Sequence, residues 1–166
     1  MAATASFDIT STVDFQEVDN ALNQARKEVA QRYDFKGATA DIDLNPTDKK
    51  LTLTADDDFK MRALWEIVQT RLVRRGVAVK NFKEAESEPA AGGTVRRVIE
   101  IQQGIPIEAA REIVKFLKDL KLKKVQAAIQ ADQVRVSSPS KDELQEAMRQ
   151  LREHDFGVAL QFGNYR

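Results

Sequence analysis

The chain has 166 residues, 42% of them hydrophobic, and its 26 basic and 26 acidic side chains cancel to a formal net charge of zero. This length suits one large or two small domains, and the charge balance argues against bulk electrostatic binding to nucleic acid or membranes. The chain has no cysteine, no run near the roughly 18 apolar residues of a membrane span and no signal-peptide pattern at its N-terminus. We therefore expect a cytoplasmic protein without disulfides, in which any anion site is local.

In the first half, alternation and helical spacing of apolar residues predict the order βαββαβ. A strand over 6–11 carries Phe7 and Ile9 on one face, and a long amphipathic helix follows it. A turn-rich stretch then separates two strands of a hairpin. A second helix stops at Gly76. The predicted ranges of the hairpin strands and of the last strand are 38–44, 51–54 and 77–82.

After a polar connection over 84–93, the same order repeats. The segments 51–77 and 134–158 share a strand, a capped helix start and a closing Gly-Val pair, which is the signature of an internal repeat. The sequence therefore predicts an α+β protein of two tandem ferredoxin-like βαββαβ domains. The predicted elements of the second half are a strand over 95–102, a helix over 107–120, strands over 125–130 and 133–137, a helix over 140–152 and a strand over 159–162.

The last strand of each domain is a candidate for exchange. Strands 77–82 and 95–102 are separated by a short connection, and sequential strands usually pair, so a hairpin within the second sheet is expected. The terminal strand would then complete the first sheet beside Phe7 and Ile9. The predicted domains are 1–76 with 156–166, and 77–155. A simple tandem of 1–90 and 91–166 remains the alternative.

No catalytic, metal or cofactor motif stands out. His154 is the only histidine, and we expect it to interact with a helix dipole. The glycines form neither of the common phosphate-binding patterns. The run Asp56–Asp58 lies at a predicted helix start, where carboxylates cap free amides. We therefore predict no catalytic residues, no metal, no cofactor and no enzymatic activity.

Three stretches combine aromatic rings with Asp or Arg beyond what core periodicity requires, at 6–9, 31–37 and 160–166. Such groups can stack on a purine, accept hydrogen bonds from guanine and pair with phosphate. If the terminal strand is exchanged, the first and third stretches become neighbours. The predicted nucleotide-binding residues are Phe7, Asp8, Arg32, Tyr33, Asp34, Phe35, Lys36, Phe162, Tyr165 and Arg166.

Basic residues offer an alternative function, RNA binding. RNA recognition modules share the βαββαβ topology, but the outward positions of the central strands here lack the stacking aromatics of those modules. Contacts with phosphates across the open sheet face and along one helix remain open. The candidate phosphate contacts are Arg96, Arg135, Lys115, Lys118, Lys121, Lys123 and Lys124.

At these motifs the chain resembles the bacterial YajQ family over 6–166. The matching segments are Ser6-Phe7-Asp8-Ile9, 16–21, Arg32-Tyr33-Asp34-Phe35-Lys36, 125–132, 135–138 and the ending 161–166. The resemblance implies two ferredoxin-like domains with exchanged last strands. It also implies a cytosolic nucleotide-binding regulator, not an enzyme, with cyclic di-GMP or RNA as ligand and a transcription factor as a partner of some members.

Two positions depart from the pattern of that family. Ala131 stands where the family usually has glycine, and Pro139 stands where a basic residue is common. Both positions lie around the second hairpin and the following helix start, which argues against a ligand site there. The leading hypothesis is a regulator that binds cyclic di-GMP or another guanine nucleotide. Occupancy would then be signalled to a partner protein or nucleic acid.

Overall fold

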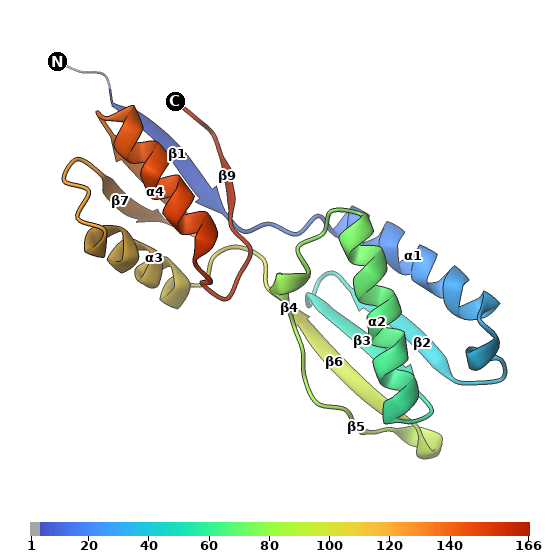
Figure 1. The fold of residues 1–166 in the computed structure, drawn as a ribbon. Helices are drawn as coiled ribbons and strands as arrows, with labels where there is room; N and C mark the ends of the chain where they lie inside the picture. Colours follow the sequence, from blue (N-terminus) through green and yellow to red (C-terminus); the bar gives the residue numbers. More distant parts are fainter. Residues whose placement is uncertain (1–3) are drawn as a thin grey trace. The chain divides into compact units, whose positions relative to one another are not determined.

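The computed structural model describes residues 4–166, which form two β-sheets and four α-helices (Figure 1). These elements form two compact units, each with its own hydrophobic core. Unit 1 joins the N-terminal segment that ends at Thr12 to Gln103–Arg166, and unit 2 is Val13–Gln102. In the order of the chain, unit 2 is therefore inserted between the first strand and the remainder of unit 1.

Unit 1 has an antiparallel sheet of order β7-β8-β1-β9. Phe7 and Ile9 on β1 stand opposite Val136 and Val134 on β8, and all four side chains are fully buried. They pack in one core cluster with apolar residues of both helices, such as Leu151. The elements are β1 (Ala5–Thr10), α3 (Ile107–Asp119), β7 (Gln126–Gln130), β8 (Gln133–Ser138), α4 (Lys141–Glu153) and β9 (Gln161–Gly163).

Unit 2 has a sheet whose main path runs β2-β3-β6-β4, with the short strand β5 also paired to β6. Leu53 on β3 and Ile99 on β6 pack with Leu22, Leu64 and Trp65 of the helices. The elements are α1 (Phe15–Gln31), the 3₁₀ turn Tyr33–Phe35, β2 (Ala40–Asn45), β3 (Lys50–Ala55), α2 (Asp58–Arg74), the 3₁₀ turn Val79–Asn81, β4 (Phe82–Lys83), β5 (Glu88–Pro89), the 3₁₀ turn Ala91–Gly93 and β6 (Val95–Ile101).

Side chains cap three of the helices at their N-termini, where backbone amides lack helical partners. Asp14 accepts hydrogen bonds from two amides of α1, and Ser140 accepts one from the amide of Glu143. Asp57 accepts from the amide of Lys60 at 2.8 Å. The capping role predicted for the acidic run at the start of α2 is therefore confirmed for Asp57.

The predicted strand pairs are confirmed, but their placement in the two sheets differs from the prediction. Ile9 pairs with Phe162, and Phe82 pairs with Ile101. However, β1 lies between β8 and β9, and β6 lies between β3 and β4. The chain therefore does not divide into 1–76 with 156–166 and 77–155, nor into a simple tandem. The reason is that the core side chains of β1 face those of β8, whereas β6 packs on β3.

Within residues 4–166, none of the helices combines the length and the apolar character that crossing a membrane requires.

Candidate functional site

The two ends of the chain meet in unit 1, as predicted for the first and third aromatic stretches. β9 pairs with β1, and beyond β9 the backbones of Ser6 and Arg166 exchange two hydrogen bonds. The Ser6 amide donates to the Arg166 carbonyl at 3.2 Å, and the Arg166 amide donates back at 3.0 Å. The last residues of the chain are therefore part of the sheet.

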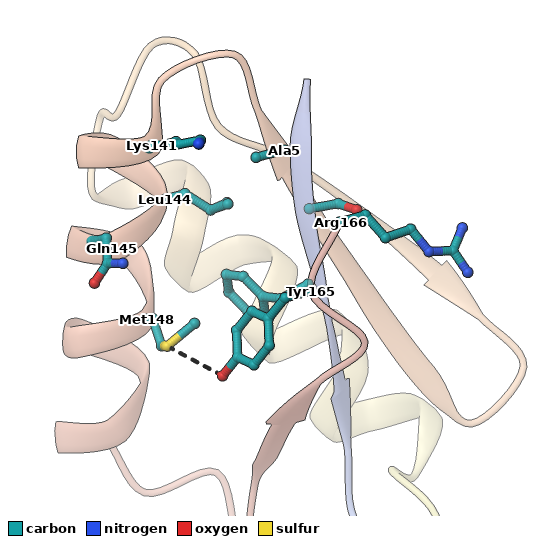
Figure 2. Close-up of a pocket in the computed structure, with 9 residues that line it drawn as sticks. Ala5, Lys141, Leu144, Gln145, Met148, Tyr165 and Arg166 are labelled. Carbon is teal, nitrogen blue, oxygen red and sulfur yellow. Dashed lines mark hydrogen bonds between the residues drawn. The ribbon is translucent and has the colours of Figure 1, made fainter. Parts of the chain in front are cut away.

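A pocket of about 290 Å³ lies between α4 and the paired chain ends (Figure 2). The Phe7 ring, which lines the pocket, is fully buried, whereas Tyr165 is 62% exposed. The two ring centroids are 6.4 Å apart, and the Tyr165 hydroxyl lies 4.0 Å from the Met148 sulfur. The pocket is lined by Ala5, Ser6, Phe7, Lys141, Leu144, Gln145, Met148, Tyr165 and Arg166.

The polar groups of the pocket come mainly from α4. Figure 2 shows Lys141 at the start of α4 extending toward Ala5, and Gln145 one turn further along the helix. The guanidinium of Arg166 extends away from α4, so this residue lines the pocket through atoms nearer its backbone. Lys141 and Gln145 are not among the site residues predicted from the sequence. Their spacing of four residues puts them on one helix face, but only the fold shows what this face meets.

Asp8 lies on the opposite face of the sheet from Phe7, because side chains alternate along a strand. It is 7% exposed and accepts hydrogen bonds from Arg135 Nε at 2.9 Å and from Asn164 Nδ2 at 2.6 Å. These hydrogen bonds, that of Arg135 first, lower the pKa of the Asp8 carboxyl. Asp8 is therefore ionised and engaged near neutral pH, and it does not share the pocket of Tyr165.

The predicted segment Arg32–Lys36 belongs to unit 2, whereas the chain ends belong to unit 1. Arg32 forms two hydrogen bonds with the Asp34 carboxylate, at 2.9 and 2.7 Å, which raise the pKa of Arg32 and lower that of Asp34. Phe35 is buried, with the Arg32 guanidinium 5.5 Å from its ring centroid. Tyr33 is 90% exposed and Lys36 is exposed. Of the charged groups predicted for this segment, Arg32 and Asp34 thus pair with each other.

The two arginines predicted to share one sheet face lie in different units. Arg96 on β6 of unit 2 forms an ion pair with Glu88 at 2.9 Å, and Arg135 on β8 of unit 1 is paired with Asp8. The predicted lysine cluster lies on α3 and in the segment after it, and all five side chains are exposed: Lys115, Lys118, Lys121, Lys123 and Lys124.

His154 lies at the C-terminal cap of α4, the helix end predicted for it. Its ring lies 4.7 Å from that of Phe116 and 4.5 Å from that of Phe156, so it packs in an aromatic cluster. Across residues 4–166, no three His, Cys, Asp or Glu side chains are grouped so that they could hold a metal ion.

Comparison with known proteins places the chain in one family. The sequence profile of the family "Nucleotide-binding protein YajQ-like" matches residues 5–166. A nucleotide-binding protein of Carboxydothermus hydrogenoformans is 46% identical over 166 residues, which is the full length of both chains. One from Elusimicrobium minutum is 47% identical over 97% of this chain and 98% of its own, and one from Solibacter usitatus is 49% identical over 97% and 96%. The chain belongs to the YajQ-like family of nucleotide-binding proteins.

Proposed function

We propose that the chain binds a guanine nucleotide, with cyclic di-GMP as the first candidate, in the pocket between α4 and the C-terminal segment. The observation that carries this proposal is Tyr165, an aromatic ring that is 62% exposed at a pocket also lined by the buried Phe7 ring. Exposed aromatic rings stack on purine and pyrimidine bases alike, and each stacked base contributes about 1–3 kcal/mol to the binding free energy. The family name supports a nucleotide as the ligand.

The two sides of the pocket have different chemistry, as a nucleotide requires. Leu144, Met148 and Tyr165 offer apolar and aromatic surface to a base. Lys141 supplies a cation at the first residue of α4, where the helix dipole also favours an anion. Gln145 carries a carboxamide with both a donor and an acceptor for the edge of a base. We infer that the base lies against Tyr165 and the phosphate lies toward Lys141.

Calorimetric titration with cyclic di-GMP, GTP, ATP and a short RNA tests the proposal. Tyr165→Ala should weaken cyclic di-GMP binding by roughly five- to a hundredfold. Lys141→Ala should weaken it as well, and more strongly at low salt. Phe59→Ala and Lys27→Ala are the matched controls, because both side chains are exposed on helices of unit 2 and neither belongs to the pocket.

The result also separates the two candidate locations. Unchanged affinity in Tyr165→Ala and Lys141→Ala, with both variants folded, would contradict a site in this pocket. If Tyr33→Ala lowers the affinity instead, the ligand binds the Arg32–Lys36 segment of unit 2.

We further propose that occupancy of the pocket is passed to a partner, either a transcription factor or a nucleic acid. A ligand can transmit a signal only when it binds one arrangement of the protein better than another. The alternative, RNA binding, draws support from the five exposed lysines between Lys115 and Lys124. Phosphate contacts release counterions, so a steep salt dependence of RNA affinity would favour that alternative.

We also infer that the chain binds its nucleotide without turning it over. Its one histidine lies against the rings of Phe116 and Phe156, and its sequence has no cysteine. When the protein is incubated with GTP and Mg²⁺, phosphate release should not increase with the protein concentration. Release that persists through repurification would contradict this inference.

For the architecture, we infer two ferredoxin-like units of which the second is permuted. Unit 1 runs β1-α3-β7-β8-α4-β9, which is the order βαββαβ. In unit 2, β6 lies between β3 and β4. In unit 1, β1 has the equivalent position between β8 and β9.

A further inference from the structure

The C-terminal segment contains an irregularity that decides where Tyr165 points. Gly163 stands opposite Asp8, and Arg166 exchanges backbone hydrogen bonds with Ser6. Two steps along β1, from Asp8 to Ser6, are therefore matched by three steps along the C-terminal segment. One extra residue in one of two paired strands is a β-bulge, and it re-aims the side chains around it.

Asn164 is the residue that makes this bulge possible. Its φ is +54°, in the left-handed region that asparagine tolerates better than most residues. Its side chain lies on the open face of the sheet, where Nδ2 donates to Asp8 Oδ2 at 2.6 Å. The next side chain, Tyr165, lies on the helix-covered face against Phe7 and Met148.

A regular strand would place this ring on the other face. Phe162 faces Phe7 on the helix side, and their ring centroids are 5.7 Å apart. With strict alternation, position 164 would follow on that side and position 165 would face the open side. The bulge reverses this order and brings Tyr165 into the pocket, and Arg166 then extends away from α4 (Figure 2).

We propose that Asn164 is a positioning residue, held by Asp8, that fixes the bulge and so keeps Tyr165 in the pocket. Asp8 is suited to this task because Arg135 holds its carboxylate from the neighbouring strand through both oxygens, and the Asn164 amide donates to Oδ2. The anchor and the binding surface thus lie on opposite faces of one sheet. The effect on ligand affinity rests on the proposed function, whereas the effect on Tyr165 does not.

The chain carries a natural probe of the Tyr165 ring. It has three methionines, of which Met148 lies against Tyr165 and Met61 is buried in the core of unit 2. Methyl ¹³C labelling of methionine lets NMR report the ring current of Tyr165 at the Met148 methyl without any ligand. Tyr165→Ala gives the reference position of this methyl signal when the ring is gone.

Asn164→Gly is the sharpest variant, because glycine adopts the positive φ without strain but lacks the amide. Asp8→Asn keeps the shape of the partner and removes its charge. In both, the Met148 methyl should move toward its position in Tyr165→Ala, the Met61 methyl should stay, and cyclic di-GMP affinity should fall roughly three- to tenfold because fewer molecules hold the ring in place. Gln133→Ala, on the same open face as Asp8, is the control that should change neither.

An unmoved Met148 methyl in both variants would overturn the positioning role, whatever the affinity does. If the methyl moves but the parent protein binds no guanine nucleotide, the positioning role stands and the proposed function fails. If the methyl stays and the variants bind as tightly as the parent, the nucleotide proposal stands and the role of Asn164 is wrong.

Discussion

Asp8 and Arg135 stand directly opposite each other on β1 and β8, and the Arg135 Nε donates to the Asp8 carboxylate at 2.9 Å. Although the two residues are 127 positions apart in the chain, their ion pair joins β1 to β8 on the open face of the sheet. Asn164 binds the second oxygen of the same carboxylate. One carboxylate therefore links the first strand, the second hairpin and the end of the chain.

Removal of this carboxylate should destabilise unit 1. Asp8→Ala leaves the Arg135 guanidinium and the Asn164 amide without their acceptor, which typically costs about 1–3 kcal/mol. Amide hydrogen exchange should show faster exchange in β1, β8 and β9 and unchanged exchange in unit 2. Asp119→Ala is the control, since this exposed carboxylate at the end of α3 should change stability by less than about 0.5 kcal/mol. Equal exchange in Asp8→Ala and the parent would contradict a structural role for the carboxylate.

The stability of unit 1 should fall in acid partly through Asp8. Its hydrogen bonds, first that from Arg135, lower its pKa in the folded protein, so the folded state holds the proton more weakly than the unfolded chain. The stabilisation is therefore complete above the unfolded pKa of about 3.9 and is lost as the pH falls through the lower folded pKa.

Urea unfolding followed by NMR of the β8 amides, repeated at values from about pH 6 down to about pH 2, measures this loss. The free energy of unfolding should change less steeply with pH in Asp8→Asn than in the parent. Glu146, whose pKa is lowered to about 2 chiefly by its hydrogen bond with Arg149, acts with the same sign. The comparison therefore includes Glu146→Gln. If the unfolding free energy depends on pH identically in Asp8→Asn and the parent, groups other than Asp8 cause the acid sensitivity.

The insertion of unit 2 predicts that Val13–Gln102 folds without the rest of the chain. This segment holds all four strands of its main sheet path and its own core, with Trp65 buried in it. The fragment should keep the tryptophan emission and the amide spectrum of unit 2 in the full chain. A fragment with the emission of exposed tryptophan would show that unit 2 depends on unit 1.

Ala131→Gly should stabilise unit 1. Ala131 lies in the turn between β7 and β8 with a φ of +56°, a conformation that strains a residue with a Cβ atom. Glycine removes this strain but makes the unfolded chain more flexible. We therefore expect the free energy of unfolding to rise by up to about 1 kcal/mol. Urea unfolding of the two proteins measures the gain. Ala128→Gly, an exposed position inside β7, should destabilise instead.

Local pairing was predictable from the sequence, whereas the membership of the sheets was not. The hairpins β2–β3 and β7–β8 follow from alternation and turn residues, and the pairs β1–β9 and β4–β6 follow from connection lengths and the expected strand positions. Alternation shows which face of a strand is buried but not which sheet the strand joins. β1 and β6 both carry alternating apolar residues, and only the fit of Phe7 and Ile9 against Val136 and Val134 separates them.

The candidate site was predicted only in part, for a similar reason. The concentration of aromatic and charged residues at both chain ends indicated that these ends meet, and they do. The bulge at Asn164 could not be read from the sequence, so Asp8 and Tyr165 were expected on one surface although they lie on opposite faces. Lys141 was missed because the register of α4 against the last residues depends on the folded unit.

The most direct test of the nucleotide site is a titration of the methyl-labelled protein with cyclic di-GMP. Met148 lines the pocket and Met61 lies in the core of unit 2, so one spectrum contains both the probe and its control. We predict a saturable shift of the Met148 methyl signal, an unchanged Met61 signal and, in Tyr165→Ala, saturation only at a higher concentration of cyclic di-GMP. A Met148 signal that stays in place while calorimetry shows the same ligand binding would contradict the account.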